Sequence, residues 1–214
     1  MTRRLALCLL LWVRLARADA GEDDWIAAAS AAVAFGQAQG LPLILQIDNS
    51  ADLPGHSPLG LQDEHGRCVL VVAARANPTA QHLEAMLAPP LRRLFIDGAA
   101  IHEVGHCHWR LHGHGAHWKP LPLLAALAPI RRWYERRLRT EEAFADMTEV
   151  AWLARFHPDA YDAMLVQILR VRTRYFEPRH DTLAWLRQAR SAGPLPVADK
   201  LFDDAGLRMA LGAD

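Results

Sequence analysis

The chain has 214 residues, 51% of them hydrophobic, so it is long enough for one well-buried domain and short for two. Lysine and arginine total 24, and aspartate and glutamate also total 24, which gives a formal net charge of zero. This balance gives no indication of a nucleic-acid partner or of binding to an anionic membrane surface. We therefore expect one domain, over residues 21–214, without a nucleic-acid partner.

The first 20 residues are typical of a secretory signal peptide. A basic start, MTRR, precedes the apolar run LALCLLLWV, and residues 18–20 (ADA) offer small side chains at the cleavage positions. The apolar run covers nine residues, far fewer than the ~20 that a membrane-spanning helix needs. We expect cleavage after Ala20, export to the periplasm or out of the cell, and no stable membrane anchor in the mature chain.

The mature chain would keep two cysteines, Cys68 and Cys107. In an oxidising compartment such a pair can form a disulfide. Two separate buried thiols fit the sequence equally well, because a sequence does not show whether the two Cα atoms come within bridging distance.

The first third of the mature chain predicts a helix followed by a small sheet. Residues 25–40 (WIAAASAAVAFGQAQG) have the apolar spacing of a helix, with Gly40 just past its end. Two short apolar runs, Leu43–Ile47 and Cys68–Ala73, are bounded by turn-rich residues and predict strands. The second of these strands is a candidate edge for binding an extended peptide.

The rest of the chain predicts helices. The pattern becomes helical at Pro78, breaks at Pro89-Pro90, continues from about Leu91 to Leu111, and gives way to a loop over residues 112–122. Four more helices are expected, over residues 130–156, 158–176, 182–192 and 197–209. The predicted fold class is α+β and mainly helical, with a small N-terminal sheet and a helical C-terminal half.

Residues 101–109 (IHEVGHCHW) contain the pattern H-E-x-x-H within a predicted helix. Residues four apart lie on one face of a helix, so His102 and His106 can direct ring nitrogens at one ion. Glu103 is rotated from them by about a hundred degrees, so its carboxylate can reach a water at the ion without binding the ion itself. The motif predicts a zinc site with Glu103 as general base.

A catalytic zinc usually keeps three protein ligands and one open position. The stretch RTEEAFADMTEVAW places Glu142 and Asp146 four apart on a later helix. Glu142 can complete the site, and Asp146 can accept a hydrogen bond from a ligand histidine and so orient it. Glu141 is the adjacent alternative, but Ala145 follows it four residues later, so Glu142 fits better.

H-E-x-x-H followed on a later helix by E-x-x-x-D resembles the gluzincins, the thermolysin-like zinc metallopeptidases. The resemblance covers the two motif helices, about a quarter of the chain. It implies a zincin-like fold, one Zn²⁺ held by His102, His106 and Glu142, and hydrolysis of peptide bonds in a peptide or protein substrate.

Gluzincins typically stabilise the tetrahedral oxyanion with a histidine or tyrosine from the helical half, and such a donor lowers the activation barrier by a few kcal/mol. In the stretch EPRHDTLAWL, His180 is the candidate for this role and Arg179 is the next choice. Three tyrosines are further candidates: Tyr134, Tyr161 and Tyr175.

Two alternatives remain open. His112 follows His102 by ten residues, the spacing of the third ligand in metzincins, but Trp109 stands where metzincins carry glycine, and tryptophan adopts a left-handed turn only at a cost. A non-catalytic zinc-binding periplasmic protein is the other alternative, and it would use a closed site with four protein ligands. The residue pattern does not separate a protein target from a peptidoglycan peptide or a signal-peptide fragment, and it does not set the oligomeric state.

Overall fold

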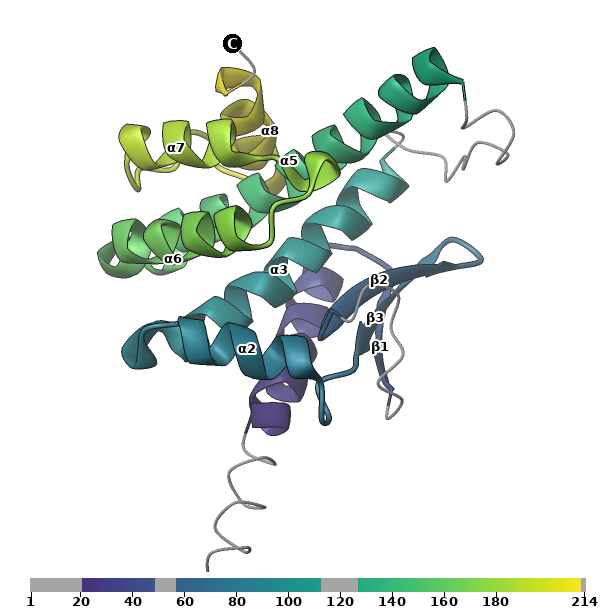
Figure 1. Ribbon diagram of the computed structural model, residues 1–214, viewed down its shortest axis with the longest axis vertical. Helices are drawn as coiled ribbons and strands as arrows, with labels where there is room; N and C mark the ends of the chain where they lie inside the picture. The colour runs from purple at the N-terminus through teal and green to yellow at the C-terminus, as the bar shows by residue number, and fades with distance from the viewer. Residues whose placement is uncertain (1–20, 49–56, 113–126, 213–214) are drawn as a thin grey trace, which may run out of the picture.

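The computed structural model describes residues 21–48, 57–112 and 127–212, which form a mainly helical α+β fold with a small sheet, as predicted (Figure 1). The predicted signal peptide and nearly all of the predicted loop over residues 112–122 lie outside the described residues. Among the residues that are described, no helix is both long and apolar enough to cross a membrane.

The sheet has three strands in the order β1-β3-β2: β1 (Leu43–Ile47), β2 (Leu59–Glu64) and β3 (Arg67–Val72). β1 runs parallel to β3, and β2 runs antiparallel to it. The prediction of β1 and β3 is confirmed, and β3 is buried from Cys68 onward, as its unbroken apolar run suggests. β2 was not predicted, because its residues LGLQDE follow a turn-rich segment and half of them are polar.

A two-residue turn joins β2 to β3. His65 and Gly66 both have positive φ, 54° and 79°, and turns of this kind match the right-handed twist of the flanking strands. The prediction that β3 offers a free edge is wrong, because β3 pairs on both sides. Among the described strands, the edges are β1 and β2.

The N-terminal helix covers residues 21–38 and is followed by Gly40 in a left-handed conformation, with φ 81°. α2 (Pro78–Met86), a short 3-10 turn at Pro89–Leu91 and α3 (Arg92–Leu111) follow the sheet. Apolar side chains of the N-terminal helix, the sheet and α3 form one core. Its largest fully buried members include Trp25, Leu43, Leu70 and Ile96.

The C-terminal half consists of α5 (Ala128–Phe156), α6 (Tyr161–Arg174), α7 (Leu183–Ala192) and α8 (Leu201–Leu211). Single 3-10 turns, Pro158–Ala160 and Pro178–His180, precede α6 and α7. These helices enclose a second core, whose fully buried members include Met147, Leu153, Tyr161, Leu165 and Leu186. The four predicted helices are present, although the last begins at Leu201 instead of Val197, after a segment that contains two prolines.

α3 and α5 pack closely where the motif lies (Figure 1). A Cβ atom added to Gly105 would lie 2.8 Å from Oγ1 of Thr148 and 2.9 Å from Cα of Ala145. Only glycine permits this approach, because the second contact is with backbone. The glycine between the two motif histidines thus brings α3 against the part of α5 that carries Glu142.

Cys68 of β3 and Cys107 of α3 form a disulfide, with their Cα atoms 5.8 Å apart. Of the two alternatives for these cysteines, the structure therefore has the disulfide. Because Cys107 directly follows His106, the bond ties the motif helix to the central strand of the sheet.

Candidate metal centre

His102 and His106 on α3 and Glu142 on α5 form a group that could hold a metal ion. The two Nε2 atoms are 3.0 Å apart, and each is 3.6 Å from an oxygen of Glu142. A tetrahedral ion bound at 2.0–2.1 Å separates its ligand atoms by roughly 3.3 Å. The three predicted ligands therefore have the mutual spacing that a zinc-sized tetrahedral ion requires.

The other ring nitrogens of the two histidines face carboxylates. Nδ1 of His102 is 2.9 Å from Oδ1 of Asp146, and Nδ1 of His106 is 3.0 Å from Oε1 of Glu141. Carboxylate oxygens accept, so both Nδ1 atoms carry a proton, and a ring without a second proton presents a lone pair at Nε2. Two lone pairs facing each other at 3.0 Å repel unless a proton or a cation lies between them. The two Nε2 atoms are therefore placed to bind one cation between them.

The charges of the group follow from its burial and its partners. Burial lowers the pKa of His102, but hydrogen bonds to Asp146 and Glu142 outweigh it and raise the pKa to about 10 in the metal-free protein. Burial raises the pKa of Glu142, but the charge of His106 and hydrogen bonds from His102 and His180 hold it well below the usual range. The pKa of Asp146 is also lowered, because Arg172 and His102 outweigh the effect of burial. The acids of the site are thus ionised, as metal binding requires, and His102 would release its second proton when an ion binds.

Further side chains hold the carboxylates behind the histidines. The Arg172 guanidinium on α6 and the Thr182 hydroxyl just before α7 both donate to Asp146. Nε of Arg110 donates to Glu141 at 2.8 Å, and together with His106 it lowers the pKa of Glu141 to about 2 against the effect of burial. These contacts fix the orientation of both rings.

Sequence reasoning missed most of this supporting layer. Asp146 was predicted to bond a ligand histidine, and the structure places it on His102. Arg110, Arg172 and Thr182 were not connected with the site, because no local spacing links them to the motif. Glu141 was considered only as an alternative ligand, and the structure places it behind His106 instead.

His180 lies at the site, with Nε2 3.2 Å from Oε1 of Glu142. Of the other predicted oxyanion donors, Tyr161 donates to the carbonyl of Ala189 in the core, and Tyr175 packs edge-on against His82. Tyr134 is on α5, eight residues before Glu142, and the side chain of Arg179 lies outside the described part of the chain.

His112 lies at the end of α3, where Nδ1 donates to the carbonyl of His108 at 3.0 Å and the two rings stack. Neither group of described side chains that could hold an ion includes His112. The geometry therefore gives no support to His112 as a third ligand.

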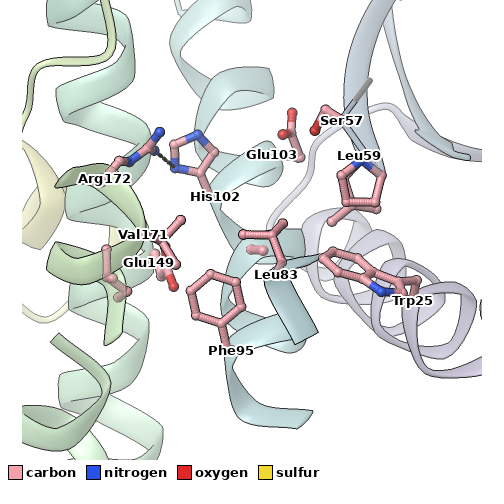
Figure 2. A pocket seen from close by; sticks show the side chains of 13 residues that line it. Trp25, Ser57, Leu59, Leu83, Phe95, His102, Glu103, Glu149, Val171 and Arg172 are labelled. Atoms are coloured by element: carbon pink, nitrogen blue, oxygen red, sulfur yellow. Dashed lines mark hydrogen bonds between the residues drawn. The ribbon is translucent and has the colours of Figure 1, made fainter. Parts of the chain in front are cut away.

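A cavity of about 170 Å³ lies beside His102 and Glu103 (Figure 2). Apolar side chains make up most of its wall, and three charged side chains, Glu103, Glu149 and Arg172, also line it. Figure 2 shows Glu103 between His102 and Ser57, on the side of the cavity nearest β2. The apolar lining residues are Trp25, Pro58, Leu59, Leu83, Phe95, Ala99, Ile168 and Val171.

Comparison of the chain with models of protein families, with curated proteins and with solved structures found no match.

Proposed function

We propose that the protein is a zinc-dependent metallopeptidase with a zincin-like, gluzincin-type site. The observation that carries this proposal is the arrangement of His102 and His106, whose Nε2 atoms face each other at 3.0 Å while both Nδ1 atoms are bonded to carboxylates. Glu142 supplies the third donor, and Glu103 lines the adjoining cavity. Two imidazoles and one carboxylate form a donor set typical of catalytic zinc.

Zinc, when bound, would lower the pKa of a water toward ~7 and polarise the substrate carbonyl. Glu103 takes the proton from the water that attacks the carbonyl carbon and passes it to the leaving amine. His180 donates a hydrogen bond to the carbonyl oxygen as negative charge develops there. Arg172, Glu141 and Asp146 are positioning residues, because they act through the histidines or through Glu142.

An extended peptide would bind along β2, the edge strand next to α3. The backbone N–H of Ala73 donates to the carbonyl of Pro58 at 3.0 Å. In antiparallel pairing the hydrogen-bonded residues alternate, so the backbone groups of Leu59 and Leu61 point away from β3. Adding a substrate strand to such an edge is a common mode of peptide recognition. Nη1 of Arg110 already donates to the outward carbonyl of Leu61 at 3.2 Å.

We further propose that the mature protein, residues 21–214, works outside the cytoplasm. The disulfide between Cys68 and Cys107 supports this, because disulfides persist in oxidising compartments. The signal-peptide pattern of residues 1–20 points the same way.

Replacing Glu103 with glutamine tests the proposed function. Glu103→Gln should keep one zinc per chain in metal analysis, while the hydrolysis of a fluorogenic peptide library falls by about 10²–10⁴-fold. Glu135→Gln is the matched control, since it removes a charge from the exposed part of α5 and should change neither quantity. Full activity in Glu103→Gln would rule out the assigned base.

X-ray absorption on the zinc-loaded protein separates the peptidase from a non-catalytic zinc-binding protein. Three protein ligands and one water would support catalysis, whereas four protein ligands would indicate a closed, structural site.

A further inference from the structure

Glu149 is a buried acid that the proposed mechanism does not use. It lies on α5, its residue is only 5% exposed, and it lines the cavity beside His102. Among the described residues its Oε1 has no hydrogen-bond partner. A carboxylate that is buried without a partner costs free energy, which a ligand with a suitable donor would recover.

Most of the other side chains that line the cavity are apolar. Figure 2 shows Glu149 near Phe95 and Val171, with Leu83 close by. Its volume of about 170 Å³ is many times the ~10–15 Å³ of accessible volume that a single water needs, so the cavity has room for a side chain. α3 leaves space for the carboxylate, because a Cβ atom added to Gly98 would lie 2.5 Å from Oε1 of Glu149.

A second metal ion does not suit this end of the cavity. His102, Asp146 and Glu149 do bring ligand atoms within 4.8 Å of one another. However, Nδ1 of His102 is already bonded to Asp146, and Nη2 of Arg172 lies 3.5 Å from that nitrogen while donating to Asp146. The ring nitrogen and the carboxylate oxygen are therefore already engaged, and neither is free to bind a second ion.

We propose that the cavity binds a lysine-like substrate side chain, with its alkyl stem against Leu83, Phe95 and Val171 and its primary ammonium group on the Glu149 carboxylate. This inference rests on the proposed peptidase function, because it places the side chain beside the scissile bond next to His102 and Glu103. The charge of Arg172 does not oppose it, since Asp146 pairs with that guanidinium directly. Long amphipathic side chains bind in this manner, with the stem on apolar surface and the charge at a polar partner.

The test compares two peptides that differ at the residue adjacent to the scissile bond, one with lysine and one with norleucine, which has a similar stem without the ammonium group. The zinc-loaded mature protein at pH 8 should cleave the lysine peptide with a kcat/KM about 10–100-fold higher, as expected for a buried charge-assisted hydrogen bond. Glu149→Gln should bring this ratio to about 1, and Glu135→Gln should leave it unchanged.

A binding measurement separates failure of this inference from failure of the proposed function. Nα-acetyl-lysine methylamide and the norleucine analogue are titrated against the same proteins by NMR. A preference for the lysine amide that depends on Glu149 supports the inference even if no peptide is cleaved, whereas cleavage without a lysine preference overturns the inference and leaves the peptidase intact.

Gly98→Ala provides a variant that keeps the acid. The added methyl group would lie 2.5 Å from Oε1 of Glu149, so the carboxylate must shift and the lysine preference should fall. A lysine preference that survives in both Glu149→Gln and Gly98→Ala overturns the proposal.

Discussion

Glu141 and Glu142 are adjacent on α5, yet they face opposite sides of one imidazole. Oε1 of Glu141 lies 3.0 Å from Nδ1 of His106, and Oε1 of Glu142 lies 3.6 Å from Nε2 of the same ring. The second oxygen of Glu142 is 3.6 Å from Nε2 of His102, whereas Glu141 is held by Arg110. The two acids are therefore placed for different roles: Glu142 could donate to an ion, and Glu141 holds the ring of a proposed ligand.

This relationship predicts different losses of zinc affinity. Glu141→Ala should weaken zinc binding about 10–100-fold, as is usual when a partner of a ligand is removed. Glu142→Ala should weaken it by more, because a ligand itself is lost, and His112→Ala should leave it unchanged. Competition with a chromogenic chelator measures all three. A larger loss in His112→Ala than in Glu142→Ala would favour the metzincin-like alternative.

His180 should affect the rate more than the occupancy of the metal site. His180→Phe removes a donor near the carbonyl oxygen of the substrate, so kcat should fall about 10²–10³-fold. KM should change little, and metal analysis should still find one zinc per chain. An unchanged kcat would assign the oxyanion to another donor, and a loss of zinc would show that the main role of His180 is at the metal site, either as a ligand or as the partner of Glu142.

The disulfide should stabilise the fold substantially. Cys68 and Cys107 are 39 residues apart, and the loop-closure model assigns about 4 kcal/mol to a loop of that length. The double variant Cys68→Ala/Cys107→Ala should therefore unfold at a lower urea concentration than the oxidised protein. Reductant should lower the urea midpoint of the parent protein and leave that of the double variant unchanged. Equal midpoints of the parent with and without reductant would show that the disulfide does not stabilise the fold.

Glu149 predicts a pH dependence of stability in the metal-free protein. Burial raises its pKa to about 7 in the folded chain, whereas an unfolded glutamate titrates near ~4.3. Between these two pKa values the folded state retains a proton that the unfolded state has lost. The stability that Glu149 contributes is therefore complete below the unfolded pKa and is lost as the pH rises through the folded pKa of about 7. Relative to Glu149→Gln, the free energy of unfolding of the parent should fall by roughly 2–3 kcal/mol between pH 4 and pH 8.

Urea unfolding of both proteins in the presence of chelator at several pH values gives this difference. A difference that stays constant across the range would mean that Glu149 titrates normally.

The parts of this site that follow the helical repeat were predictable from sequence. His102, His106, Glu142 and Asp146 stand at spacings of four, which place each pair on one helix face. Arg172 and Thr182 could not be predicted, because only the packing of α6 and α7 against α5 brings them to Asp146. The strand β2 was missed for a similar reason, since pairing with β3 defines it and its own composition does not.

The glycine that separates Val104 from His106 sets how far α5 stands from α3, and with it how far the Glu142 carboxylate stands from the two imidazoles. Ligand distances at a zinc site tolerate deviations of about 0.2 Å. A methyl group at position 105 would displace the α5 backbone at Ala145 by more than that, because its Cβ would lie 2.9 Å from the Cα of Ala145. If the site holds zinc as proposed, its affinity depends in part on a residue that has no side chain and never contacts the metal, and a substitution there should weaken binding although all three proposed ligand residues are still present.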